Sequence, residues 1–480
     1  MQGYETVIGL EVHIQLSTRS KVFCADDTSF GSSPNTQVSA ISLAHPGTLP
    51  RLNGEVVRSA VKLGLALGCT IDQASRFDRK NYFYPDLPKG YQITQDHKPI
   101  CVGGEVALPE RVIRIHHIHM EEDAGKSIHD QSPEHTYIDL NRAGVPLLEL
   151  VTQPDLRSAD ETAAFMEEIR RLVRWLNVSD GNMEEGSMRC DVNISVRKSG
   201  ETAYGQRCEI KNVNSMRFAK RAIEYESARQ IALLEAGEIV EQQTRGFDPV
   251  SGVTYPQRDK ENAHDYRYFP EPDLPPVLIS DQQMEDIRAG MPPLPKALFE
   301  RLTQTCQLPA YDAQLLTQER VAAEWFCALT EGASPAAAKT LANLVINKLM
   351  PWWNEQNISP DRQPVSDDTW KAFAALLDSR KVSASAAYQQ LFPAVLAQPD
   401  RDPQLLAEQM GLLQSDDSDF LNEIIETVLQ RFPDKVAEYK KGKKGLIGMF
   451  MGEIMRAAKG KADPKTTQQL LEEKLKQDVA

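Results

Sequence analysis

Long apolar runs are missing from the 480 residues of this chain. No stretch reaches the ~18 consecutive apolar residues that a membrane-spanning helix needs. The N-terminal residues MQGYETVIGLEV enter a strand-like pattern at once, without the charged and apolar regions of a signal peptide. We therefore expect a soluble, cytoplasmic protein that makes no contact with a membrane.

Cysteine is also scarce. The seven cysteines are scattered, their number is odd, and no two are spaced as Cys-x-x-Cys. This pattern argues against both a disulfide framework and a thiolate zinc site. We expect the cysteines to be buried free thiols.

Positive charge is in short supply over most of the chain, but not at its end. The net charge is −14, which by itself disfavours a nucleic-acid partner. The last fifty residues, 431–480, nevertheless carry 12 Lys and Arg against 7 Asp and Glu, a net charge of +5, which leaves −19 for the rest. The sequence thus places a basic tail on an acidic body.

The length exceeds what one hydrophobic core usually holds, so two or three domains are expected. Strand and helix patterns alternate up to about residue 294, whereas helical patterns dominate from Pro295 onward. Proline- and aspartate-rich joints at 398–403 and 414–419 mark a second boundary. We predict an α+β domain with a mostly antiparallel sheet (1–294), a helical domain (295–405) and a basic helical tail (406–480).

The first strand carries two polar side chains that are typical metal ligands. Residues 6–16 alternate between apolar and polar positions, and the polar face presents Glu11 and His13. A strand face that needed only solvation would more often use Thr, Lys or Ser. We therefore favour a functional role for both side chains.

The densest polar segment runs from His116 to Lys126 and reads HHIHMEEDAGK. Imidazoles, carboxylates and a lysine this close together are typical of a site that holds a divalent cation against phosphate. The competing interpretation is a solvated charged loop. A zinc site built on the three histidines is disfavoured, because on a strand His117 and His119 share a face while His116 points away. The Gly-Lys-Ser step is not a P-loop, because Met120 stands where that motif needs glycine.

Further segments also place polar side chains on one face of a predicted strand. Residues 137–151 predict two strands around Gly144, with Glu149 isolated in an apolar run, where a carboxylate is costly to bury unless it is paired or bound to metal. RCDVNISVR presents Arg189 and Asp191, and RCEIKNVNS presents Glu209 and Lys211. A charged sheet face of this extent is more often an active-site floor than a plain surface.

The segment from Arg76 to Gln92 combines cations, aromatic residues and two prolines. The prolines hold a stiff loop that suits phosphate and a planar base, although a packed aromatic turn explains this segment equally well. The candidate cofactor-binding residues across all of these segments are Arg79, Lys80, Lys89, Lys126, Arg189, Glu209 and Lys211.

The tail contains two glycine-broken joints with clustered lysines, KKGKKG and AAKGKADPK. Such clusters bind phosphate backbones, although solvated helix ends look similar. The lysines that we predict to contact the phosphates of a nucleic acid are Lys440, Lys441, Lys443, Lys444, Lys459, Lys461 and Lys465.

Several long segments, in this order, resemble the B subunits of the tRNA-dependent amidotransferases, three-subunit enzymes that make Gln-tRNA(Gln) or Asn-tRNA(Asn). The resemblance covers essentially the whole chain. The segments are ETVIGLEVHIQL, FDRKNYFYPDLPKGYQI, HMEEDAGKS, DLNRAGVPLLELVTQPD, MEEGSMRCDVNIS, EIKNVNS and DYRYFPEPDLPP.

The resemblance implies a cradle-like domain similar to glutamine synthetase, a helical domain and a tail of the YqeY type. It also implies that ATP phosphorylates the side-chain carboxylate of mischarged Glu-tRNA(Gln) or Asp-tRNA(Asn), and that ammonia from the glutaminase then attacks it. The glutaminase is the A subunit of such enzymes, so the implied partners are the A and C subunits. Carried over by motif, Glu11, His13, Glu122 and Glu149 would hold Mg²⁺, with Asp191 nearby as a further catalytic residue.

One departure from the family concerns zinc. Many members carry paired Cys-x-x-Cys motifs near the start, where this chain has Cys24-Ala25-Asp26-Asp27 and Ser39-Ala40-Ile41-Ser42. We therefore expect no zinc.

Two other classes of function stay open at this stage. A carboxylate-amine ligase for a small molecule would share the polar floor but leave the basic tail unexplained. A non-catalytic tRNA-binding protein would explain the tail but not the carboxylates.

Overall fold

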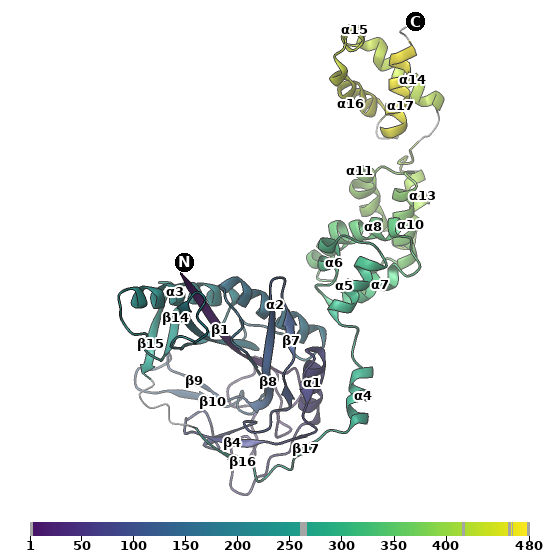
Figure 1. Ribbon diagram of the computed structural model, residues 1–480. Helices are drawn as coiled ribbons and strands as arrows, with labels where there is room; N and C mark the ends of the chain where they lie inside the picture. The colour runs from purple at the N-terminus through teal and green to yellow at the C-terminus, as the bar shows by residue number, and fades with distance from the viewer. Residues whose placement is uncertain (1–2, 260–265, 415–417, 459–461, 463, 478–480) are drawn as a thin grey trace. The chain divides into compact units, whose positions relative to one another are not determined.

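The computed structural model describes residues 3–259, 266–414, 418–458, 462 and 464–477 (Figure 1). The chain forms two compact units, Met1–Leu294 and Pro295–Ala480. The first combines strands and helices and the second is helical, which confirms the α+β class. The further division near residue 405 stays a prediction. None of the helices in the described part of the chain has the length and apolar character of a membrane span.

The first unit is built on a ten-stranded sheet with the order β15-β14-β13-β12-β1-β11-β8-β6-β2, to which β7 adds by pairing with β8. Its neighbours are antiparallel except β13 and β14, which run parallel. The strands are β1 Tyr4–Gln15, β2 Thr70–Ile71, β6 Cys101–Val102, β7 Glu105–Ala107, β8 Val112–Glu122, β11 Pro146–Thr152, β12 Met188–Lys198, β13 Cys208–Val213, β14 Gln243–Asp248 and β15 Val253–Asp259.

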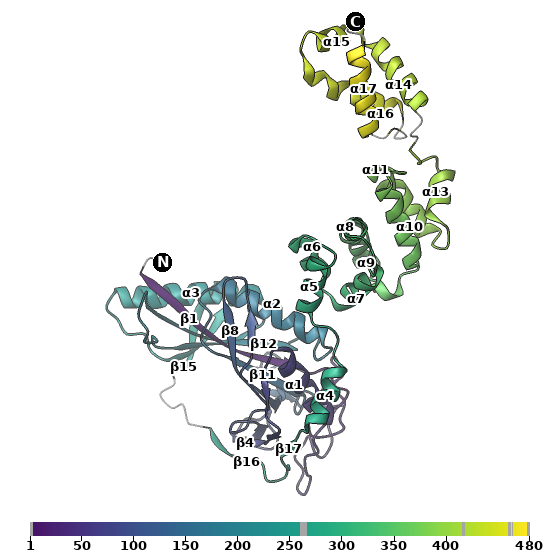
Figure 2. The ribbon, with the colours of Figure 1, turned by 45° about the vertical axis from the view of Figure 1, so that its right-hand side comes forward.

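The alternation predicted for the first strand is confirmed. Ile8, Leu10, Val12 and Ile14 are fully buried, and they join the apolar side chains of β8, β11 and β12 in one core. Helices α2 (Ala159–Trp175) and α3 (Met216–Glu235) lie on this side of the sheet in both views (Figures 1 and 2), while α1 (Gly54–Ala66) packs against β8. The polar face of the sheet is thereby turned the other way.

Helix α2 follows Ser158, whose Ser-x-x-Glu spacing is that of a capping box, but the box is only half formed. The Ser158 hydroxyl accepts a hydrogen bond from the Glu161 amide (3.1 Å). The Glu161 carboxylate accepts from the amide of Arg157 (2.7 Å) rather than from that of Ser158. The buried stripe of Phe165, Ile169 and Val173 fixes the helix on the core.

Small sheets lie on the polar side of the large one. A three-stranded sheet has the order β16-β4-β5, and two pairs, β9 with β10 and β3 with β17, complete this side. In both views β4 and β16 lie across the large sheet from α2 and α3 (Figures 1 and 2). The elements are β3 Ala74–Ser75, β4 Asp78–Asn81, β5 Tyr91–Thr94, β9 Lys126–Ile128, β10 Tyr137–Asp139, β16 Arg267–Pro270, β17 Val277–Leu278 and helix α4 Asp281–Ala289.

The second unit is helical throughout, as predicted. Pro351 is the second residue of α9, which directly continues a π-helical turn at Val345–Leu349, so helical backbone runs through this proline. The helices are α5 Pro295–Gln304, α6 Ala310–Leu316, α7 Arg320–Leu329, α8 Pro335–Leu344, α9 Met350–Gln356, α10 Asp367–Asp378, α11 Ala384–Ala386, α12 Phe392–Ala397, α13 Pro403–Gln409, α14 Ser418–Arg431, α15 Pro433–Lys440, α16 Ile447–Ala457 and α17 Pro464–Gln477.

Candidate active site

Strand register assembles a cluster of imidazoles and carboxylates on the polar face of the large sheet. His13 on β1 lies opposite Glu149 on β11, and Glu149 lies opposite His119 on β8. Opposed side chains on neighbouring strands are within contact distance. Glu121 follows His119 by two residues, so it points to the same face. We call these four residues the histidine–glutamate cluster.

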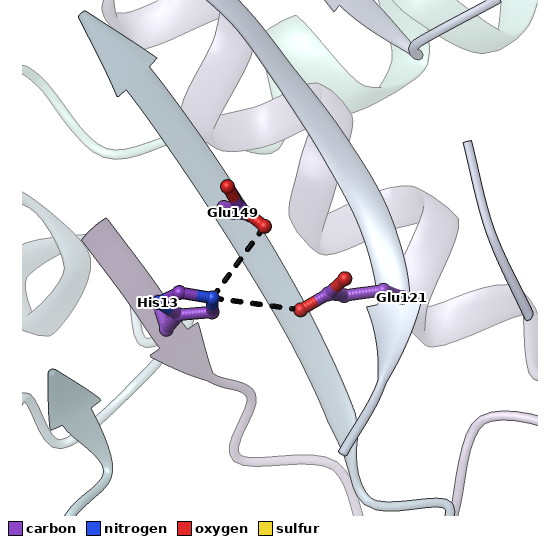
Figure 3. Close-up of side chains that lie close together, drawn as sticks. All are labelled: His13, Glu121 and Glu149. Carbon is purple, nitrogen blue, oxygen red and sulfur yellow. Dashed lines mark ion pairs between the residues drawn. The ribbon is translucent and has the colours of Figure 1, made fainter. Parts of the chain in front are cut away.

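The distances within this cluster are short. His13 Nε2 lies 3.4 Å from Glu149 Oε2 and 3.8 Å from Glu121 Oε1 (Figure 3). His119 Nε2 lies 3.3 Å from Glu149 Oε2 and 3.5 Å from Glu121 Oε2. One ligand atom each from His13, Glu121 and Glu149 falls within 4.8 Å of the others, an arrangement that could hold a cation.

The cluster is electrostatically coupled. Burial would lower the pKa values of His13 and His119, but Glu149 and Glu121 outweigh it and raise them to about 9 and about 10. Burial would likewise raise the pKa of Glu149, but the two imidazoles hold it well below its ordinary value. Two positive rings therefore lie among these carboxylates where a metal ion could lie instead.

A second cluster lies beside the first and is purely anionic. Glu11 is opposite Asp191, and one carboxylate oxygen each from Glu11, Asp191 and Glu209 falls within the same 4.8 Å limit. The Lys211 ammonium bridges two of them, at 3.0 Å from Asp191 and 2.7 Å from Glu209. Burial and the nearby carboxylate of Glu149 raise the pKa of Glu11. A hydrogen bond donated by Asn193 (2.8 Å) acts against this rise. We call this group the carboxylate cluster.

The expected four-ligand set does not assemble as the sequence suggested, because Glu122 faces away from it. Its buried carboxylate forms an ion pair with Lys89 and accepts a hydrogen bond from the Ile93 amide (2.9 Å). Side chains alternate along β8, so Glu121 and not Glu122 shares the face of His119. The sequence analysis missed Glu121 and His119, although the period of two from His117 onward indicates both.

The side chains of His116, His117 and His119 contact one another in sequence. His117 Nε2 lies 3.0 Å from His119 Nδ1, and His116 Nδ1 lies 2.7 Å from His117 Nδ1. The expectation that His116 points away is therefore wrong at this position. Burial and the neighbouring imidazoles lower the pKa of His117 to about 4.

The candidate cofactor-binding residues Arg79, Lys80 and Lys89, on β4 and the loop after it, contact different side chains. Arg79 is clamped by Glu271 (2.7 and 2.9 Å) and by Asp273 (3.0 Å). Lys89 is held by Glu122, whereas Lys80 Nζ lies 4.6 Å from the ring centre of Tyr266. The structure therefore occupies Arg79 and Lys89 with internal ion pairs and leaves Lys80 beside an aromatic ring.

Of the other two candidate cations, Arg189 forms an internal ion pair and Lys126 is exposed. Arg189, on β12, donates to Asp123 at 3.0 Å, whereas Lys126 is exposed at the start of β9. The glycine before Lys126 serves packing, since a Cβ on Gly125 would lie 2.9 Å from the Asp139 carbonyl. The Gly125 amide donates to the Asp86 carbonyl (2.8 Å), so it is not free to bind phosphate, in line with the rejection of a P-loop.

The described lysines of the tail lie at the surface. Lys440, Lys441, Lys443 and Lys444 are exposed around the end of α15, and Lys465 is exposed in the first turn of α17. Lys443 pairs with Glu438 (3.1 Å), and Lys444 lies over the Tyr439 ring (4.4 Å). Lys459 and Lys461 lie outside the described residues.

Two segments of this chain stand where many family members carry Cys-x-x-Cys motifs, and hydrogen bonds join them. Cys24 Sγ lies 3.4 Å from the Ser42 hydroxyl, which donates to the Asp26 carboxylate. The Ser39 amide also donates to Asp26 (2.9 Å). A carboxylate thus joins these loops, while the absence of zinc stays a prediction that elemental analysis can check.

Comparison with known proteins first defines the class. A family model described as the GatB/GatE catalytic domain matches residues 6–285, which include both clusters, and one described as the GatB domain matches residues 324–475. Relatives from Salinibacter ruber and Anaeromyxobacter dehalogenans are each 46% identical over 99% of this chain, covering 97% and 99% of their own lengths. A relative from Geotalea daltonii is 47% identical over 98% of this chain and 99% of its own.

All three relatives are named as the B subunit of aspartyl/glutamyl-tRNA(Asn/Gln) amidotransferase. The chain belongs to this family. It is thus one component of a ligase that acts as a multi-subunit complex in tRNA-dependent amidation.

Proposed function

We propose that this chain carries the phosphorylation and amidation site of a three-subunit amidotransferase, in which the glutaminase, or A subunit, and the C subunit are its partners. Its substrates are ATP and mischarged Glu-tRNA(Gln), Asp-tRNA(Asn) or both. The observation that carries the proposal is the pairing of two ligand clusters on adjacent strands of one sheet face. That face lies within the region matched by the catalytic-domain model.

The chemistry explains why such a site is needed. A carboxylate is a poor electrophile toward ammonia. Transfer of the γ-phosphoryl group of ATP to a carboxylate oxygen yields ADP and an acyl phosphate. Ammonia then forms the C–N bond, phosphate leaves with the C–O bond electrons, and the proton lost from nitrogen passes to phosphate or solvent. Catalysis of the first step depends mainly on positioning and on charge stabilisation.

The donor set fits Mg²⁺, a hard cation that prefers carboxylate oxygens and shares its shell with substrate phosphates. Glu149, Glu121 and His13 would form one set, and Glu11, Asp191 and Glu209 the other. When bound, Mg²⁺ would supply positive charge against the phosphoryl oxygens. In the second set the Lys211 ammonium pairs with two of the three carboxylates, which leaves an excess of negative charge that favours a cation.

The chain's own cations have distinct tasks in this proposal. Lys211 holds Asp191 and Glu209 in place, so the second set keeps its geometry before substrates arrive. Arg189 lies beside His13 in the strand register and is anchored by Asp123, so its guanidinium borders the first set. Both offset negative charge where phosphate must approach.

The test is Glu149→Gln in the reconstituted complex, which removes a charge without changing the side-chain shape. Transamidation of Glu-tRNA(Gln) with ATP should be abolished, while the glutaminase still releases ammonia from glutamine. Glu105→Gln, a change of an exposed glutamate at the edge strand β7, is the matched control. Wild-type turnover by the Glu149→Gln variant would show that the Glu149 carboxylate is not a ligand of the site. Turnover of free glutamate by the wild-type complex would instead indicate a small-molecule ligase.

A further inference from the structure

One face of the small sheet formed by β16, β4 and β5 is lined with tyrosines. The strand register places Tyr268 beside Lys80, and Lys80 beside Gln92. Tyr266 and Tyr82 lie two residues from Tyr268 and Lys80, so they belong to the same face. We call the group of Lys80, Tyr82, Tyr266 and Tyr268 the tyrosine face.

The rings of this face form a connected aromatic surface. The centroids of Tyr82 and Tyr266 are 5.6 Å apart, and those of Tyr266 and Tyr268 are 6.5 Å apart, each pair meeting edge to face. Tyr84 extends the surface, with its centroid 5.7 Å from that of Tyr82. Tyr266 is 45% exposed and Tyr84 is 52% exposed, so the surface is open rather than part of the core.

The opposite face of the same small sheet carries Arg79 and its partners, and its Phe269 ring is 39% exposed. Arg79 stacks on Tyr91 (4.3 Å) and on Phe269 (5.8 Å) while Glu271 holds its guanidinium. Lys80, in contrast, forms no ion pair among the described residues, and its ammonium lies 4.6 Å from the Tyr266 centroid. The cation on one face is thus held by carboxylates, whereas the cation on the tyrosine face contacts only aromatic rings among the described residues.

The tyrosine face is turned toward the histidine–glutamate cluster. The Tyr82 hydroxyl donates to the Gln92 side chain (3.4 Å), whose amide donates to the Glu122 carbonyl at the end of β8 (2.7 Å). Burial raises the pKa of Tyr82, and the charge of Glu121 adds to it. The tyrosine face is thus connected through Gln92 to β8, the strand that carries His119 and Glu121.

We propose that the tyrosine face is a stacking surface for an adenosine, supplied either by ATP or by the 3′-terminal nucleotide of tRNA. The proposal rests on the proposed function, which requires both molecules at this site. Bases stack on exposed aromatic side chains with little regard to sequence, and Lys80 supplies a positive charge for the adjoining phosphate. Tyr268 lies in β16, and Tyr82 and Tyr266 directly adjoin β4 and β16, so strand pairing positions the rings before binding, which lowers the entropic cost.

The experiment measures binding to the complete complex, without turnover. Tyr266→Ala and Tyr266→Leu remove the aromatic ring, the second while keeping apolar bulk, and Tyr266→Phe keeps the ring. Phe269→Ala is the matched control, because it removes an aromatic ring three residues from Tyr266 but from the opposite face of the small sheet. Thermal melting checks that each variant is folded. If Tyr266→Ala is unfolded, Tyr266→Leu is used in its place.

Two probes separate the sources of the adenosine. If ATP supplies it, Tyr266→Ala and Tyr266→Leu should weaken ADP binding by about 5- to 150-fold, with Tyr266→Phe and Phe269→Ala within about twofold of wild type. If tRNA supplies it, wild type should bind intact tRNA more tightly than tRNA lacking its 3′-terminal adenosine, and the ring-deleted variants should lose that preference.

The proposal is overturned if the ring-deleted variants bind ADP as wild type does and also keep the preference for intact tRNA. Transamidation by the same wild-type preparation is measured alongside. A wild-type complex that amidates Glu-tRNA while the ring deletions leave both binding readouts unchanged refutes the stacking surface alone. A wild-type complex that amidates neither charged tRNA refutes the proposed function, whatever the binding results.

Discussion

Glu121 and Glu122 are adjacent in the sequence, yet their carboxylates lie on opposite faces of β8. Glu121 lies 3.8 Å from His13 Nε2, whereas Glu122 pairs with Lys89 and accepts from the Ile93 amide. Alternation along the strand is the cause, and it assigns one of these two buried glutamates to the histidine–glutamate cluster and the other to the opposite side of β8.

This relationship predicts different effects of two chemically identical substitutions. Glu121→Gln should raise the Mg²⁺ concentration needed for half-maximal transamidation by about tenfold or more, because it removes a charge from the proposed ligand set. Glu122→Gln should lower stability through loss of the buried ion pair while leaving the Mg²⁺ requirement unchanged. Mg²⁺ titrations of both variants, with melting curves, make the comparison. The reverse pattern would restore Glu122 as the ligand.

Glu226 on α3 predicts a pH dependence of stability. Burial would raise its pKa, but hydrogen bonds from Arg229, Gln230 and Thr254 outweigh it and hold the pKa below 4.5. The unfolded chain therefore binds more protons, and the stabilisation is present above the unfolded pKa and lost as the pH falls through the folded one. Glu226→Gln should cost about 3 kcal/mol at pH 7 and less in acid.

Unfolding of wild type and Glu226→Gln at several pH values measures this difference. Glu235→Gln, at the exposed end of the same helix, serves as the control and should change stability by less than about 0.5 kcal/mol. An unfolding difference between wild type and Glu226→Gln that is independent of pH would show that the side chain acts through packing and not through its charge.

The tail should supply most of the affinity for tRNA. Ending the chain near Gly411 should leave a complex that still binds ATP and Mg²⁺ but holds tRNA much more weakly, because the remaining body is acidic. Filter binding of mischarged tRNA compares the two forms. Equal affinity would make the tail a structural or protein-docking element.

Single substitutions refine this test. Lys441→Gln, which neutralises an exposed lysine at the end of α15, should flatten the plot of log affinity against log salt by about 1. Lys474→Gln is the control, because that ammonium is already paired with Glu426. A slope that is unchanged by Lys441→Gln would remove this residue from the contact.

The chain on its own should not release ammonia from glutamine. Six of its seven cysteines are buried, and Cys24, the partly exposed one, hydrogen-bonds to Ser42, while burial raises its pKa, so it is not activated as a nucleophile. An ammonia assay on the purified single chain checks this. Activity that survives further purification would make the protein self-sufficient.

Much of the site followed from the sequence because strand periodicity is local. The alternation in residues 6–16 predicted β1 and placed Glu11 and His13 on one face, and the same period found Asp191, Glu209 and Lys211. Each of these assignments needs only the direction of successive side chains. The cap of α2 is equally local, since Ser158 accepts from the amide of Glu161 three residues away.

What the sequence could not supply depends on pairing between distant segments. The registers of β1 with β11 and of β11 with β8 decide that His119 and Glu121 meet His13 and Glu149. Arg79 looked like a phosphate ligand until its partner Glu271 appeared across 192 residues of chain. The sequence by itself determined which faces are polar; the tertiary structure alone decided which polar groups share a site, because ion pairs and ligand sets form between strands whose partners no local pattern encodes.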